Sequence, residues 1–169
     1  MRFLPAIKDI ADVSKKTNFA EKNRMISLFN QVSESYQECN ENTKPWISAV
    51  IEEEGFKEGN ISYIFMSDDM LLEINKRHLN HDFYTDIITF DLSDEEKEIS
   101  AEIFISTDRV MENAIQFGEI YPKEMHRVMI HGVLHLCGYN DHTEEEKSSM
   151  RKKEDYYLSK LDLSIMLES

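Results

Sequence analysis

Cysteine is scarce in this chain: Cys39 and Cys137 are the only two among 169 residues, and they form no CxxC pair. Two cysteines so far apart in the sequence do not build a disulfide framework, so we expect both to stay reduced in the cytoplasm. Long apolar runs are also lacking, and we therefore expect no membrane-spanning segment and no membrane partner. The sequence contains no internal repeat and no low-complexity segment.

Positive charge is in short supply. The chain has 19 lysines and arginines against 33 acidic residues, which gives a formal net charge of −14. Such a chain repels polyphosphate on average, so sequence-blind binding to nucleic acid is disfavoured and DNA is not an expected partner. A role on RNA would require a local basic patch, a metal ion, or a partner protein that supplies the positive charge.

The length fits one domain, because 169 residues can bury one sizeable hydrophobic core but are too few for two domains of typical size. Residues 1–24 differ from the rest, since they carry six basic residues against three acidic ones. We expect this segment to be a loosely attached N-terminal extension and residues 25–169 to form the domain. The apolar content of 41% is ordinary for a globular protein.

Hydrophobic patterning predicts four strands and five helices. Strands rich in β-branched and aromatic residues are expected over residues 26–33, 61–67, 86–92 and 99–106. Helices are expected over residues 42–55, 67–79, 107–118, 122–138 and 143–161, the last with a capping box of Thr143 and Glu146. The short polar connection over residues 94–98 predicts that the last two strands form a hairpin. We therefore expect a single α+β domain in which about five helices cover a small mixed four-stranded sheet.

The segment HGVLHLCGYNDH, residues 131–142, contains three histidines. His131 and His135 are four residues apart, so on a helix both imidazoles project from one face and can share one ion. Gly138 can take a positive φ, end the helix and turn the chain back, which lets His142 reach the same ion from the loop. Three imidazoles leave the fourth position of zinc open to water, and zinc lowers the pKa of that water to about 7. We therefore expect one catalytic Zn²⁺ per chain.

Cys137 and the other histidines are not expected to bind the metal, and the site does not match that of a HExxH protease. Zinc proteases with a HExxH motif use the residue after the first histidine as general base, but Gly132 has no carboxylate. Cys137 lies about 200° around the helix from the second histidine and should point into the core. His126 is expected on the helix surface, well off the ligand face. His78 and His81 lie near the end of an earlier helix and are expected to cap it.

The histidine segment resembles the HGxLHLxGYDH signature of the YbeY family, the bacterial endoribonucleases of rRNA maturation. Two further segments agree with this resemblance. LEINKRHLNHDFYTDIITFDL is similar to the family's LN…TDVLSF segment, and SAEIFISTDRV is similar to its GDIxIS strand and the helix that follows. Met150 and Glu154 match a methionine and a glutamate of the family's last helix. The similarity covers roughly residues 26–160.

The resemblance implies an α+β fold, zinc as the cofactor, and cleavage of single-stranded RNA in small-subunit rRNA maturation and ribosome assembly. It also implies a small-subunit ribosomal protein and an assembly GTPase as partners. Two alternatives remain open. One is a non-catalytic, zinc-containing assembly factor, which the net charge of −14 favours. The other is a metal-dependent hydrolase of another substrate, including a peptide; an open coordination position favours an enzyme of either kind.

The chain departs from the family pattern at three places. The family's third histidine follows the second by six residues, whereas His142 follows His135 by seven. We favour His142 as the third ligand, with Asp141 either as the alternative ligand or as a residue that orients a ligand imidazole. The family's GD pair is AE here, and its carboxylate, Glu102, is expected to accept a proton or position water. An arginine of the family aligns with Leu79.

Substrate-binding residues are expected next to that missing arginine. Thr85 and Asp86 match the family's TD pair and are expected to line the cleft. Lys76, Arg77, His78 and His81 form a local cationic cluster that can meet phosphate, and Arg77 or His78 can stand in for the arginine.

Overall fold

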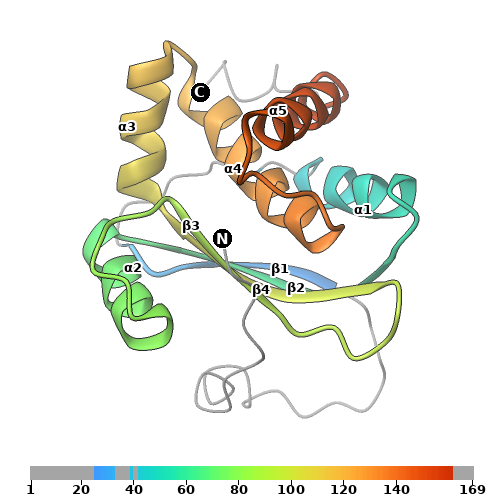
Figure 1. Cartoon of the computed structure of the whole chain (residues 1–169), viewed down its shortest axis with the longest axis horizontal. Coiled ribbons are helices and arrows are strands. Elements are labelled where there is room, and N and C mark those ends of the chain that lie inside the picture. The colour runs from blue at the N-terminus through green and yellow to red at the C-terminus, as the bar shows by residue number, and fades with distance from the viewer. Residues whose placement is uncertain (1–24, 33–38, 40–41, 162–169) are drawn as a thin grey trace.

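The computed structural model describes residues 25–32, 39 and 42–161. The predicted extension over residues 1–24 lies outside the described residues, as does the end of the chain after residue 161. Within the described part, four strands and five α-helices form one α+β domain, as the sequence predicts. The strands run through the middle of the molecule in Figure 1, with helices on either side.

The sheet is mixed, as expected. Its strands are β1 (Met25–Asn30), β2 (Lys57–Met66), β3 (Ile87–Asp91) and β4 (Glu98–Ser106), in the spatial order β1-β2-β4-β3. The strands β1, β2 and β4 are parallel. Strand β3 runs antiparallel to β4, which confirms the predicted hairpin and makes β3 an end strand of the sheet.

Helices lie on both faces of the sheet (Figure 1). One face carries α1 (Thr43–Glu53), α3 (Thr107–Phe117), α4 (Tyr121–Leu136) and α5 (Glu144–Leu158), and the other carries α2 (Asp68–Ile74). The expected helix over residues 67–79 changes pitch near its end, where a π-helical turn, η2, spans Asn75–Leu79. The predicted capping box of α5 is confirmed, because the side chains of Thr143 and Glu146 each accept from the backbone N–H of the other.

The main core lies between the sheet and α4. Ile61, Tyr63 and Ile103 of the strands are fully buried there, and so are Met129 and Val133 of the helix. Successive strand side chains point to opposite faces, so a second, smaller cluster forms on the side of α2. It comprises Ile64, Met66, Leu71, Ile88, Phe90 and Phe104.

Cys39 and Cys137 form no disulfide, as expected. Cys137 packs against the main core, as predicted, and burial raises the pKa of its thiol to about 12. No described helix combines the length and the apolar character that crossing a membrane requires.

His126 is buried, so the expected surface position is wrong. Its Nδ1 donates to the Pro122 carbonyl at 2.6 Å, which leaves Nε2 to accept from the Thr43 hydroxyl at 2.9 Å. Its ring also meets the Trp46 ring edge-on, and burial lowers the pKa of His126. The prediction failed because α4 is enclosed by the sheet, α1, α3 and α5 and buries far more than one apolar stripe.

Gly132 lets α4 lie directly against the sheet. A Cβ atom at this position would be 2.9 Å from Ile87 Cδ1, 3.0 Å from Thr89 Oγ1 and 3.5 Å from Ile103 Cγ2. The first two distances are shorter than ordinary van der Waals contacts. The glycine therefore sets the spacing between the edge strand β3 and the helix that carries the two histidines.

We expect Gly132→Glu to destabilise the fold by more than about 3 kcal/mol, because a long charged side chain has neither space nor a partner between α4 and β3. Gly132→Ala should cost only about 1 kcal/mol, since the better helix propensity of alanine offsets part of the contact strain. Chemical denaturation measures this order, with Ser149→Ala at an exposed position of α5 as the neutral control. Wild-type stability in Gly132→Glu would contradict the close approach of helix and sheet.

Candidate metal centre

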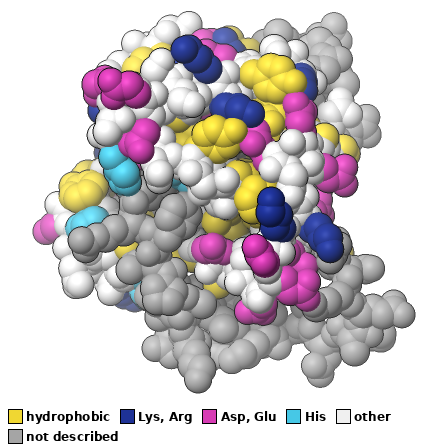
Figure 2. Space-filling model, turned by 45° about the vertical axis from the view of Figure 1, so that its right-hand side comes forward, with side chains coloured by type: hydrophobic (Ala, Val, Ile, Leu, Met, Phe, Trp, Pro, Cys, Tyr) yellow, Lys and Arg dark blue, Asp and Glu magenta, His cyan; other side chains and the backbone are white. Residues whose placement is uncertain are grey.

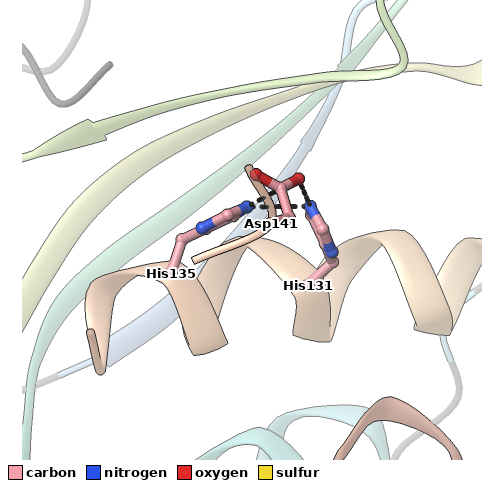
Figure 3. Close-up of side chains that lie close together, drawn as sticks. All are labelled: His131, His135 and Asp141. Atoms are coloured by element: carbon pink, nitrogen blue, oxygen red, sulfur yellow. Dashed lines mark hydrogen bonds and ion pairs between the residues drawn. The ribbon is translucent and has the colours of Figure 1, made fainter. Parts of the chain in front are cut away.

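Three side chains converge at the end of α4 (Figure 3). His131 and His135 project from one face of the helix, as their spacing predicts, and Asp141 comes from the loop that follows. The Nε2 atoms of the two histidines are 2.9 Å apart. Asp141 Oδ2 lies 3.7 Å from Nε2 of His131 and 3.6 Å from Nε2 of His135. His135 is buried, whereas His131 and Asp141 are partly exposed.

The chain after α4 turns back at Gly138. This residue has a φ of 98°, in the left-handed region that glycine adopts without strain. Its N–H donates to the His135 carbonyl, and the Tyr139 N–H donates to the Leu134 carbonyl, which closes the helix end. The turn brings Asp141 back to the two histidines.

The nitrogen of each histidine that faces away from the group is held by an acceptor. His131 Nδ1 lies 2.8 Å from Glu154 Oε1, and His135 Nδ1 lies 2.8 Å from the Tyr139 carbonyl oxygen. A carboxylate and a carbonyl only accept, so each Nδ1 carries a proton and each neutral ring turns the lone pair of Nε2 inward. Two lone pairs and the Asp141 carboxylate thus face one another. Acceptors at such distances repel one another unless a cation or a proton lies between them.

The three inner atoms fit a metal ion. The point in their plane that is equidistant from all three lies about 2.0 Å from each, which matches zinc–nitrogen and zinc–oxygen bond lengths. Two imidazoles and one carboxylate are a known ligand set of catalytic zinc. The group of His131, His135 and Asp141 can therefore hold a metal ion.

Electrostatics act differently on the two histidines. Burial alone would lower the pKa of His131, but the hydrogen bond to Glu154 and the charges of Glu154, Asp86 and Asp141 outweigh it, so this pKa is raised. Burial lowers the pKa of His135, and the neighbouring charge of His131 lowers it further. Without a metal, the pair therefore takes up one proton far more readily than two.

Glu154 is itself held by a buried cation. Arg127 Nη1 lies 3.2 Å from Glu154 Oε2 and 2.7 Å from Asp155 Oδ1. Arg127 and Glu154 are 4% and 5% exposed, and breaking such a buried pair typically costs about 3–5 kcal/mol. The sequence comparison matched Glu154 to a glutamate of the family but predicted no role for it, and it did not single out Arg127. The available signal was the position of Arg127 one helical turn before His131.

His142 does not join the group, which differs from our preference for it as the third ligand. Its side chain is exposed, and its backbone N–H donates to Glu146 at the start of α5. Asp141 takes the expected place instead. The reason lies in the length of the loop: Asp141 stands six residues after His135, where the family motif has its third histidine.

Glu102 lies on the opposite face of the sheet from the histidines. Its neighbour Ile103 faces Gly132 of α4, whereas Phe104 belongs to the cluster on the side of α2. Glu102 shares the face of Phe104, because side chains alternate along β4. Burial raises the pKa of Glu102, but the structure does not bring this carboxylate to the metal group. Its expected catalytic role is therefore not supported by the geometry.

A cavity of about 270 Å³ borders the metal group. Most of its lining comes from β3, from η2 and from the loop over residues 80–86. Thr85 and Asp86 line it, in the position that the sequence predicts for them. His131 and Asp141 line it too, so the predicted cleft and the metal group are continuous.

Of the predicted cationic cluster, His81 lines this cavity, whereas Lys76, Arg77 and His78 do not. Lys76 pairs with Asp82 at 2.9 Å, and Arg77 lies 3.6 Å from Glu73. The His78 ring meets Phe90 edge-on. The side chains of Lys76 and Arg77 are thus already paired with acidic side chains and do not reach the metal group.

Comparison with known proteins gives consistent matches. The family model described as endoribonuclease YbeY matches residues 15–162 of this chain. The endoribonuclease YbeY of Parabacteroides distasonis is 51% identical over 114 residues, which are 68% of this chain and 80% of that protein. That of Phocaeicola vulgatus is 48% identical over 121 residues, which are 72% of this chain and 87% of its own. The solution structure of TM1509 from Thermotoga maritima is similar with a TM-score of 0.58 at 30% identity, covering 79% of this chain and 87% of that one.

We expect His131→Ala, His135→Ala and Asp141→Ala each to lose the metal, because each removes one of three converging ligand atoms. His142→Ala should keep it and serves as the matched control from the same loop. Elemental analysis of the purified proteins measures the metal content per chain. Loss in His142→Ala with retention in Asp141→Ala would reverse the assignment of the third ligand.

Glu154→Gln should weaken metal binding by about 10- to 100-fold without abolishing it, because a neutral amide holds and polarises the His131 ring less strongly. Competition with a chelator measures the dissociation constant of the metal. Glu145→Gln, at an exposed position of the same helix, is the control. Equal constants for both variants and the wild type would show that Glu154 does not support its histidine.

Proposed function

Because the chain belongs to the YbeY family of endoribonucleases, we propose that it cuts single-stranded RNA at a zinc ion held by His131, His135 and Asp141. The observation that carries this proposal is the convergence of two imidazole lone pairs and one carboxylate beside a cavity. Three protein ligands leave zinc a position for water or substrate, unlike a closed structural site.

Bound zinc would stabilise the charge that develops on a phosphoryl oxygen and lower the pKa of a water molecule. The chain's own residues orient the ligands. Glu154 and the Tyr139 carbonyl hold the two imidazole rings and keep their protons on Nδ1. Asp141 completes the ligand set from the loop. Thr85 and Asp86 line the cavity next to His131 and are the proposed contacts to substrate.

A peptide substrate is less consistent with this site. HExxH proteases carry their general base directly after the first histidine. Here that position is Gly132, which lies so close to Ile87 and Thr89 that a carboxylate side chain has no room. The site therefore lacks the base that such proteases use.

The charge of the protein limits how it meets RNA. The net charge is −14, and on the face drawn in Figure 2 acidic and basic side chains are interspersed, with no broad basic patch among the coloured residues. Binding to free RNA is therefore expected to be weak and sensitive to salt. We propose that the substrate is small-subunit rRNA in the cytoplasm, and that a small-subunit ribosomal protein or an assembly GTPase brings it to the site.

A non-catalytic assembly factor is the second candidate, and the same charge favours it. In that case the ion would brace the loop after α4, and the acidic surface would bind the partner protein. The two candidates differ in one property, namely whether the metal group cuts RNA.

We expect the metal-loaded protein to cleave a labelled, unstructured RNA, and His131→Ala to lose at least about 100-fold of this activity, because it loses the ion that stabilises the transition state. His142→Ala should retain activity close to that of the wild type. Gel analysis of the cleavage products measures all three side by side, with a chelator added as a further control.

Two results would contradict this expectation. Equal cleavage by the wild type and His131→Ala would point to a contaminating nuclease. No cleavage by the wild type, together with defective rRNA processing in cells that lack the protein, would favour the non-catalytic assembly factor.

A further inference from the structure

The cavity beside the metal group has a part that is poorly suited to phosphate. Among the described residues that line it, none is a lysine or an arginine. Leu79, Ile88 and Phe90 give this part an apolar wall, and Leu79 packs against the cluster on the side of α2. Leu79 stands where the family pattern has an arginine. An apolar side chain thus replaces a guanidinium that would bind phosphate.

Asn75 places an unpaired acceptor in this lining. The residue is 1% exposed, and its Nδ2 donates to the Phe83 carbonyl at 2.8 Å. That bond fixes which end of the amide is the oxygen, and Oδ1 has no hydrogen-bond partner in the described structure. A buried acceptor without a donor costs folding free energy, so a ligand that donates an N–H group to it would remove that cost.

Thr89 adds a second unpaired polar atom. Its side-chain hydroxyl is buried, has no partner in the described structure, and lies against Gly132. Asn75 of η2 and Thr89 of β3 are both among the residues that line the cavity. The Thr89 hydroxyl faces α4, on the other side of β3 from Ile88 and Phe90, because side chains alternate along the strand.

An exposed aromatic pair completes the cavity. The rings of His81 and Phe83 are stacked, with centroids 5.0 Å apart and planes inclined by 23°. Both residues line the cavity, and Phe83 is 56% exposed. A flat aromatic face beside hydrogen-bonding atoms is what proteins use to hold bases of single-stranded nucleic acid.

We propose that this cavity holds one unpaired nucleobase of the RNA, which stacks on the aromatic pair of His81 and Phe83 and donates an N–H group to Asn75 Oδ1. The proposal rests on the proposed function, which places a phosphate of the same RNA at the metal group. A base is flat and uncharged, so it suits an apolar wall and needs no cation. The volume of about 270 Å³ is near the lower end of small-ligand pockets, about 300–1,000 Å³, and thus suits one base and not a folded RNA.

An extended peptide is the competing occupant. Strand β3 ends the sheet, and such an edge can accept an added strand through its backbone groups. A peptide bound in this way would not depend on the aromatic pair. The contribution of Phe83 to RNA binding therefore separates the two occupants.

The test compares the wild type with Phe83→Leu and with Phe117→Leu, whose ring is 54% exposed at the end of α3 and does not line the cavity. Metal-loaded, full-length protein is titrated into a fluorescein-labelled oligoadenylate, and the anisotropy before cleavage gives Kd. Phe83→Leu should bind about tenfold more weakly, because it loses the stacking of one base. Phe117→Leu should bind like the wild type.

A second series uses oligoadenylates in which one nucleotide at a time lacks its base. In the wild type, one abasic position should weaken binding by about the same tenfold factor. The same position should have little further effect in Phe83→Leu, because the contact is already lost. This coupling assigns the effect to one base and one aromatic side chain.

Equal dissociation constants for Phe83→Leu and the wild type would overturn the base site and leave the edge of β3 to a peptide. An equal loss in Phe117→Leu would overturn it as well, because the effect would not belong to the cavity. If the wild type binds the RNA in a manner that depends on Phe83 but does not cut it, the base site stands and the endoribonuclease proposal falls.

Discussion

The hydrogen bond between His131 Nδ1 and Glu154 Oε1 joins α4 to α5 inside the protein. Arg127 neutralises Glu154 at a depth where an unpaired carboxylate would be costly. The same bond keeps the proton of His131 on Nδ1 and so turns the lone pair of Nε2 toward Asp141 and His135. The packing of α5 on α4 thus also sets the tautomer and orientation of one metal ligand.

Gly132 links this group to the sheet. Because the glycine lets α4 approach β3, the metal group lies at an edge of the sheet, where the cavity between β3 and η2 begins. The close approach also removes the space for a protease-type base. In the proposed function, the metal ion meets a phosphate of the RNA, and the uncharged part of the cavity is left for a base.

Much of the fold and two of the three metal-group residues could be predicted from the sequence, because they depend on neighbours within a few residues. The helical period places His131 and His135 on one face wherever that helix lies. Gly138 ends α4 through its own backbone freedom, and Thr143 and Glu146 begin α5 through mutual hydrogen bonds. Two segments rich in β-branched residues, joined by a short polar turn, similarly predicted the hairpin of β3 and β4.

The tertiary structure decided what depends on distant contacts. His126 is buried because the sheet, α1, α3 and α5 enclose α4, which no local pattern reveals. Glu102 misses the site because the strand period tells which residues share a face, but only packing tells which face meets α4. Asp141 reaches the histidines in place of His142, whose backbone N–H donates to Glu146 at the start of α5. The sequence by itself determined the local geometry, since backbone hydrogen bonds set the periods of helix and strand. Burial, sheet face and loop path were left to the packing of elements far apart in the chain.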